Sequence, residues 1–192
     1  MAVQRDRVSA KTKKPITVSL TIKEEKNCTI SDLCNLLEGK MVEFTEHLPR
    51  IRHQYKALKN LKDSLSPSEI IVHVDFAENY CCKYGKEVQS VHFGASRAQI
   101  TLHTGVLYSY GRAPQTFCTI SEVTEHGSIP ILAHLRKILE PYVAENPEVT
   151  TIHFLSDGPS TQYKNKIMFG LIAVTRSEIF PQLKSITWNY SE

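Results

Sequence analysis

Hydrophobic and polar residues follow two different periods along this chain, and the change falls near residue 66. In residues 16–23, ITVSLTIK, every second residue is aliphatic, which predicts a strand. Residues 31–65 have the period of a helix, because apolar residues recur three or four positions apart. They are Leu37, Met41, Phe44, Leu48, Ile51, Tyr55 and Leu58, followed by Leu65. Such a stripe is more often core packing than a partner-binding seam, and Pro49 within it predicts a kink or two helices.

Residues 67–192 combine short apolar runs with longer stretches of helical period. The pattern predicts strands at 69–76, 88–94, 99–109, 116–123, 149–157 and 185–190, and helices at 128–145 and 160–178. We expect Pro141 to break or restart the helix at 128–145. The first strands follow one another closely and favour an antiparallel meander, whereas the later ones alternate with helices and should be parallel. We therefore predict an α/β fold with a mixed five-stranded sheet flanked by helices and preceded by a helical arm.

Length and composition limit the classes of protein to which this chain can belong. A chain of 192 residues is long enough for one core with an extension. It has no run of 18 apolar residues, which excludes a membrane-spanning helix, and its start, MAVQRDRVSAKTKKP, lacks a signal-peptide core. Five scattered cysteines without a CxxC pair fit a reducing compartment. We expect a disordered basic tail at 1–15, a strand and helical arm at 16–66, and the core at 67–192.

The net charge of +3 is unevenly distributed. Residues 1–14 carry +4, 15–49 carry −3, 50–62 carry +5 and 63–192 carry −3. The second basic segment contains Arg50, Arg52 and Lys56, which could contact a polyanion such as DNA or form an ordinary solvated helix face. The lysine run KTKKP could direct the chain to the nucleus, with the cytoplasm as the alternative.

Two aspartates fall at the ends of predicted buried strands. Asp75 lies in HVDFAENY and Asp157 ends TIHFLSD. Burying a carboxylate in an apolar strand is costly unless it is paired or bound to a metal. If the two strands are parallel neighbours, their aspartates converge, and a divalent cation would relieve the repulsion between them. Asp157 could instead be an ordinary turn or helix-start residue, and Glu78 could replace or assist Asp75. Glu192 follows the last predicted strand, is separated from Asp157 by 34 residues (158–191), and by itself indicates nothing.

These features carry a resemblance to a known class of enzymes. The strand and helix order, with Asp75, Asp157 and Glu192 at its strand ends, resembles the ribonuclease H-like catalytic domain of DDE transposases and retroviral-type integrases. The stretches HVDFAENY, QSVHFGASRAQITLHTGV, SDGPSTQYKNK and ITWNYSE look like a group of transposon-derived, mostly uncharacterised animal proteins. The resemblance covers residues 45–192. Members of that group continue past the glutamate into a glycine-rich segment and a helix, so the core is expected to lack its C-terminal helix.

The resemblance implies phosphoryl transfer on DNA with two Mg²⁺ or Mn²⁺ ions. Asp75 would bind both ions, and Asp157 and Glu192 would each hold one. Water would cleave a phosphodiester, and the freed 3′-hydroxyl would attack target DNA. Lys164 and Lys166 could contact phosphates, or they could belong to a solvated helix start that Ser160 or Thr161 caps.

A second constellation consists of histidines on predicted strands. If the hairpins close symmetrically, His73, His92 and His103 align across the sheet and could bind a transition metal, although ordinary packing of a half-covered face is the favoured interpretation. Three functions stay open: an active metal-dependent DNA transposase or nuclease, a catalytically dead domesticated module that binds nucleic acid or protein, and a zinc-stabilised interaction domain. DNA is the expected partner, and a homodimer is left open.

Overall fold

The apolar run at residues 69–76 forms the central strand of a mixed sheet. The computed structural model describes residues 2–8, 15–21, 23, 25, 27–77, 79–81 and 99–191. Its elements are β1 (Ala2–Val8), β2 (Pro15–Thr21), α1 (Ile30–Asp63), β3 (Glu69–Phe76), β4 (Tyr80–Cys81), β5 (Gln99–Ser109), β6 (Gln115–Ser121), α3 (Ser128–Glu145), β7 (Thr151–Asp157), α4 (Lys166–Val174), the π-helix η1 (Thr175–Ile179) and β8 (Ser185–Ser191). The predicted strand at 88–94 lies outside the described residues.

The chain divides into two units, Met1–His47 and Leu48–Glu192, and the boundary falls within α1. In the first unit, β1 and β2 pair as an antiparallel hairpin with Val3 opposite Leu20. The predicted strand at 16–23 therefore forms, as β2. Residues 2–8 form β1, where the sequence predicts a disordered tail. Pairing with β2 satisfies the backbone of β1, and a pairing of this kind leaves no periodic signal in a short segment.

α1 is a single helix that runs through Pro49. It starts with a reciprocal cap, in which Asp32 N–H donates to Thr29 Oγ1 at 3.1 Å and Thr29 N–H donates to Asp32 Oδ2 at 3.0 Å. Of the two alternatives predicted at Pro49, a kink or two helices, the division into two helices is wrong. The predicted break at Pro141 is also wrong, because α3 runs through its proline. An interior proline costs about 3 kcal/mol, which packing of the flanking turns can offset.

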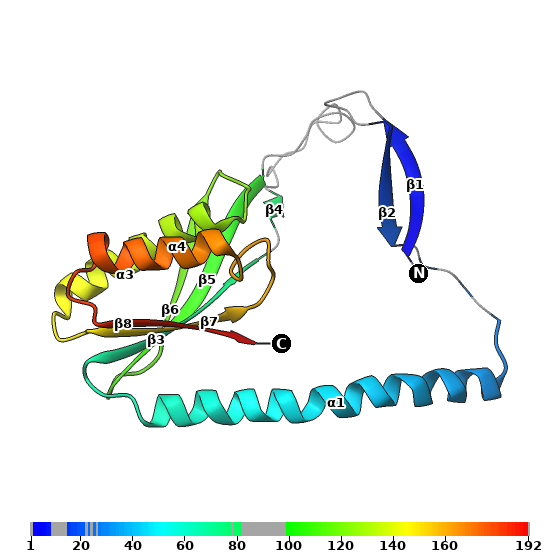
Figure 1. The fold of residues 1–192 in the computed structure, drawn as a ribbon, viewed down its shortest axis with the longest axis horizontal. Helices are drawn as coiled ribbons and strands as arrows, with labels where there is room; N and C mark the ends of the chain where they lie inside the picture. The colour runs from blue at the N-terminus through cyan, green and yellow to red at the C-terminus, as the bar shows by residue number, and fades with distance from the viewer. Residues whose placement is uncertain are drawn as a thin grey trace, which may run out of the picture. The chain divides into compact units, whose positions relative to one another are not determined.

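The six-stranded sheet belongs entirely to the second unit. Its strand order is β4-β5-β3-β7-β8, with β6 also pairing with β5 (Figure 1). β5 pairs antiparallel with β3 and with β6, whereas β3, β7 and β8 are parallel neighbours. The predicted α/β fold with a mixed sheet and a preceding helix is confirmed, with six strands in place of five.

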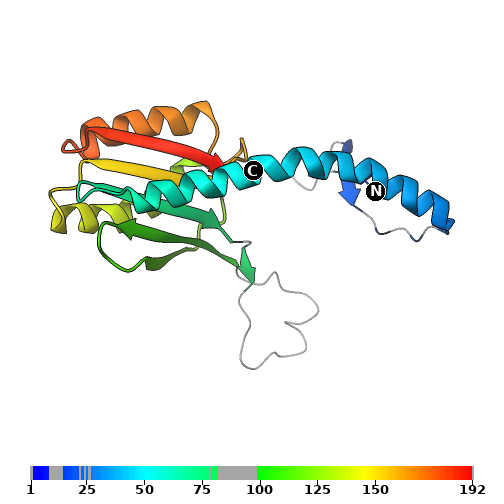
Figure 2. The ribbon, with the colours of Figure 1, turned by 90° about the horizontal axis from the view of Figure 1, so that it is seen from below.

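The core lies between one face of this sheet and the helices α3 and α4 (Figure 1). Alternate residues of β3 point into it and are at most 1% exposed: Ile70, Val72 and Val74. α3 meets them with a stripe at four-residue intervals, Ile131, Leu135, Leu139 and Val143. The second half of α1 lies against the opposite face of the sheet, which Figure 2 shows from below.

Gly105 in β5 lies at a crowded crossing of three strands. It pairs with Val74 of β3 on one side and with Phe117 of β6 on the other. A Cβ at this position would lie 2.4 Å from Phe117 Cζ and 2.6 Å from the carbonyl oxygen of His73. The Phe117 ring therefore packs where a side chain of residue 105 would lie.

We predict that Gly105→Ala destabilises the protein by about 1–3 kcal/mol, because the backbone of β3 cannot move aside. The matched control is Gly170→Ala in α4, where nothing lies within 4 Å of the added methyl group. There the same substitution should raise stability by up to about 1 kcal/mol. Urea unfolding followed by the fluorescence of Trp188 measures both. If the two variants unfolded at the same urea concentration, the claim that residue 105 has no room for a side chain would be contradicted.

Candidate active site

Two aspartates lie side by side at the carboxyl ends of the central parallel strands. The β3–β7 register pairs His73 with Leu155, and two residues further along each strand come Asp75 and Asp157. Residues two apart on a strand share a face, and neighbouring strands are about 4.8 Å apart. Both carboxylates therefore project from one edge of the sheet, on the face opposite the α3–α4 core. The condition on which the predicted site depended, that these two strands are parallel neighbours, is confirmed.

The electrostatics show that the two carboxylates interact. Burial raises the pKa of Asp157, and the negative charge of Asp75 raises it further. A divalent cation removes such repulsion, and hard carboxylate oxygens are the ligands that Mg²⁺ and Mn²⁺ prefer. The donor set at this edge therefore fits such an ion.

The described residues supply only these two acidic ligands. Within them, no group of three or more His, Cys, Asp or Glu side chains is placed to hold a metal ion. Ser191 pairs with Asp157 in the β7–β8 register and is the last residue described. The third predicted ligand, Glu192, and the alternative acid, Glu78, lie outside the described part of the chain.

The segment after Asp157 is fixed by hydrogen bonds before the next helix begins. The carbonyl oxygen of Pro159 accepts from the backbone N–H groups of residues 162, 163 and 164. Asn165 then caps α4, with its Oδ1 accepting from Met168 N–H at 2.9 Å and from Ser128 Oγ at 3.0 Å. The predicted helix start near residue 160 and the predicted caps Ser160 and Thr161 are therefore wrong. The polar Asn165 at the true start is the signal that marked it.

Tyr163 connects this segment to the core. Its side chain is fully buried, and its hydroxyl shares a hydrogen bond of 3.2 Å with His103 Nε2. Burial raises the pKa of Tyr163 above its usual range, and the negative charges of Asp75 and Asp157 raise it further. Tyr163 therefore lies within electrostatic reach of both carboxylates. Tyr190 secures the same residue by donating its hydroxyl to the Tyr163 carbonyl oxygen at 3.1 Å.

Around His103 lies a cluster of aromatic and imidazole rings that the sequence did not predict. Phe76 stacks on His126 with ring centroids 4.4 Å apart, and His134 lies 5.3 Å from His103. Thr119 Oγ1 shares a hydrogen bond of 2.7 Å with His134 Nδ1. Burial lowers the pKa of His103 to about 3, with the nearby His134 and His126 adding to the effect. His126 and His134 come from a loop and a helix, so strand periodicity could not associate them with His103.

The alignment of His73 with His103 that symmetric hairpins would produce is wrong. The register places His103 opposite Phe76 and His73 opposite Val106, three residues away. An odd offset puts the two imidazoles on opposite faces of the sheet. His92, the third member, lies outside the described residues.

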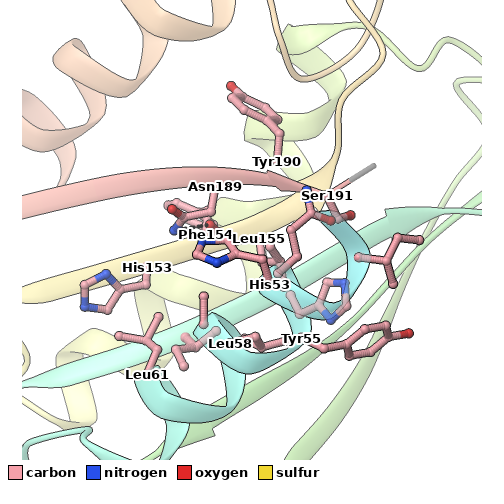
Figure 3. A pocket seen from close by; sticks show the side chains of 15 residues that line it. His53, Tyr55, Leu58, Leu61, His153, Phe154, Leu155, Asn189, Tyr190 and Ser191 are labelled. Atoms are coloured by element: carbon pink, nitrogen blue, oxygen red, sulfur yellow. Dashed lines mark hydrogen bonds between the residues drawn. The ribbon is translucent and has the colours of Figure 1, made fainter. Parts of the chain in front are cut away.

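A cavity of about 440 Å³ lies between α1 and the sheet, on the same face as the two aspartates. Figure 3 shows Leu58 and Leu61 on its helix side and Leu155 and Asn189 on its sheet side. Ser191, the register partner of Asp157, also lines it. Its wall combines aliphatic side chains with three histidines, His53, His73 and His153, and contains no Asp, Glu, Lys or Arg, so the cavity suits a largely apolar group that can also form hydrogen bonds.

The five predicted nucleic-acid contacts fall on two elements. Lys164 precedes α4 and Lys166 begins it, so both follow Asp157 closely; both are exposed. Lys164 Nζ lies 5.5 Å from the ring centre of Tyr190. Arg50, Arg52 and Lys56 lie in the second half of α1 and are exposed. None of the described helices is long and apolar enough to cross a membrane.

The fold and the carboxylate pair define an α/β domain with a candidate metal site at the carboxyl edge of its sheet. Residues 54–192 match the family described as Domain of unknown function (DUF8701), so the chain belongs to that family. The match includes the whole sheet and the second half of α1 from residue 54. No curated protein and no solved structure matches the chain.

We predict that buried His103 makes the protein less stable as the pH is lowered below about 6.5. The unfolded chain protonates this imidazole near pH 6.5, whereas the folded protein keeps it neutral down to about pH 3. Between these values the unfolded state binds more protons, so each unit by which the pH is lowered reduces the free energy of unfolding by up to about 1.4 kcal/mol. His103→Gln should flatten this slope, and His53→Gln, which changes an exposed histidine, should not. Identical slopes in urea titrations from pH 7 to 4.5 would refute the prediction.

We also expect Mn²⁺ to stabilise the wild-type protein through its carboxylate pair. At 100 times the dissociation constant, binding adds about 2.7 kcal/mol, which corresponds to a rise in melting temperature of about 5–10 °C. Asp75→Asn and Asp157→Asn should each abolish the rise. Glu148→Gln, which neutralises an exposed acid before the opposite end of β7, should keep it. An equal rise in all four proteins would show that Mn²⁺ binds elsewhere.

Proposed function

We propose that this domain is the catalytic core of a transposon-derived DDE-type enzyme that cleaves DNA phosphodiesters and transfers the resulting strand. The observation that carries the proposal is the pair of neighbouring aspartates at the carboxyl ends of parallel strands. Ligands of open α/β sheets gather at this edge. The order of antiparallel strands followed by parallel strands and helices also agrees with the ribonuclease H-like resemblance.

In this proposal the acidic residues hold two Mg²⁺ or Mn²⁺ ions. As the resemblance implies, Asp75 would help to hold both ions, and Asp157 and Glu192 would each help to hold one. When bound, such ions lower the pKa of water and stabilise the charge on the attacking and leaving oxygens. The carboxylates would confine this chemistry to the sheet edge.

The surrounding residues would position the substrate and the ligands. Tyr163, held by His103 and Tyr190, fixes the segment that follows Asp157 and so limits the movement of that carboxylate. Lys164 and Lys166 follow on the same segment and would contact phosphates near the reacting bond. Arg50, Arg52 and Lys56 on α1 would bind the DNA backbone independently of its sequence. The KTKKP run supports a nuclear location for such an activity.

We predict that the protein nicks supercoiled DNA in the presence of Mn²⁺ and that Asp75→Asn and Asp157→Asn each reduce the rate by about 10³-fold, or about 4 kcal/mol of activation free energy. Without one carboxylate the ions are not held at the reacting phosphate. Glu148→Gln is the matched control and should cut like the wild type. The assay follows conversion of supercoiled to nicked circles on a gel.

Two other results would contradict the proposal. Equal cutting by the wild type and both aspartate variants would indicate a contaminating nuclease. Binding of DNA without cutting by any of the proteins, measured by fluorescence anisotropy, would favour a catalytically dead nucleic-acid-binding module.

A further inference from the structure

The second half of α1 faces the sheet without closing against it. Ile51, Leu58 and Leu61 line the cavity between the two, and none of the 34 residues of α1 is buried. Protein interiors contain few voids larger than a water molecule, whereas small-molecule sites have volumes of about 300–1,000 Å³. The cavity of about 440 Å³ therefore has the size of a ligand site and not that of a packing defect.

The sheet side of this cavity leads directly to the two aspartates. On β3, His73 lines the cavity and Asp75 follows it on the same face. On β7, Leu155 lines the cavity and Asp157 follows it in the same way. Residues two apart along a strand are separated by about 6.6 Å. A ligand in the cavity therefore lies next to a group that is bound at the carboxylates.

The wall of the cavity alternates apolar surface with hydrogen-bonding groups. Aliphatic side chains from α1 and from the sheet are interrupted by imidazoles and by the side-chain amide of Asn189. Imidazoles and amides both donate and accept hydrogen bonds, and asparagine can pair with the edge of a base. Within the part of the chain that the structure describes, no Asp, Glu, Lys or Arg lines the cavity. This combination fits an uncharged ring with apolar faces and a hydrogen-bonding edge, which is the chemistry of a nucleobase.

One side of α1 indicates that a nucleic-acid strand is the source of that base. Arg52, Lys56 and Lys59 are spaced four and three residues apart, so they share one side of the helix, and all three are exposed. Tyr55 lies three positions after Arg52 and four before Lys59, and it is 73% exposed. Basic side chains that follow the backbone and an exposed aromatic ring that stacks on a base are the usual means of binding a single strand.

Tyr55 also lies at the end of the cavity that is nearer the carboxylates. Figure 3 shows Tyr55 and Ser191 at one end of the cavity and Leu61 and His153 at the other. Ser191 is the register partner of Asp157, so the end with Tyr55 is the one next to the acidic pair. A base from a strand bound at that edge would therefore pass Tyr55 to enter the cavity.

We propose that this cavity binds one unpaired nucleobase of a DNA strand bound at the carboxyl edge of the sheet, with the basic side of α1 along the phosphates of that strand. The inference rests on the proposed function because it takes DNA as the substrate. Binding of the base requires neither metal ions nor cleavage, so measuring binding in EDTA separates this inference from the proposed catalysis.

The test compares DNA probes by fluorescence anisotropy in EDTA at one salt concentration. The wild type should bind a duplex with one unpaired nucleotide about tenfold more tightly than the fully paired duplex, because extruding a paired base costs more. Leu58→Trp fills the cavity and Asn189→Leu removes its amide, and each should abolish this preference. Circular dichroism confirms that each variant is folded. A wild type without the preference, or two variants that both keep it, would overturn the proposal.

Stacking on Tyr55 is tested in the same assay. Tyr55→Ala should weaken binding of the probe with the unpaired nucleotide about tenfold and change binding of the paired duplex by less than about twofold. The matched control is Tyr110→Ala, which removes a ring that is 59% exposed and follows the end of β5 paired with the start of β3. It should bind both probes like the wild type. Equal weakening of both probes by Tyr55→Ala would overturn the stacking role.

Two further arms identify the source of the base. Displacement of the probe by a free deoxynucleoside as effectively as by an unlabelled strand would overturn the assignment to DNA in favour of a small molecule. Tighter binding of an RNA duplex with the same unpaired nucleotide would overturn it in favour of RNA. Nicking of DNA by a wild type that shows no preference for the unpaired probe would overturn this inference and leave the proposed function intact.

Discussion

The parallel pairing of β3 with β7 is the interaction on which the rest of this structure depends. It places the buried Ile70, Val72 and Val74 over the α3–α4 core, and with the same register it brings Asp75 next to Asp157. A shift of one residue would exchange the faces of a strand and separate both features. Core packing therefore fixes the position of the acidic pair. Burial of the apolar residues on the core face of the same strands offsets the repulsion between the two aspartates.

A buried polar pair lies on the core side of the sheet. His103 and Tyr163 are both fully buried and share a hydrogen bond, and Tyr163 lies in the segment that follows Asp157. Keeping His103 neutral has a cost below pH 6.5, because the unfolded chain can protonate it. Such a buried hydrogen-bonded pair is consistent with a site whose ligands must be held in place, which is what the proposed phosphoryl transfer requires.

α1 uses one apolar repeat in two ways. In the second unit, Ile51, Leu58 and Leu61 line the cavity against the sheet, so this part of the stripe packs within the chain. In the first unit, Leu37 and Phe44 continue the repeat with more than half of each side chain exposed. A seven-residue repeat fits both a core and a helix partner, since each requires only a continuous apolar face.

The sequence by itself determined the elements with strong periods. The strand at 69–76 and the helix at 128–145 formed with the predicted bounds, because one face of each is continuously apolar. The position of Asp75 and Asp157 at strand ends could likewise be predicted from local pattern. Only the tertiary structure decided which strands are neighbours, and therefore that His73 and His103 lie on opposite faces while His126 and His134 join His103. Register and the packing of loops arise from contacts between distant residues, which no local period encodes.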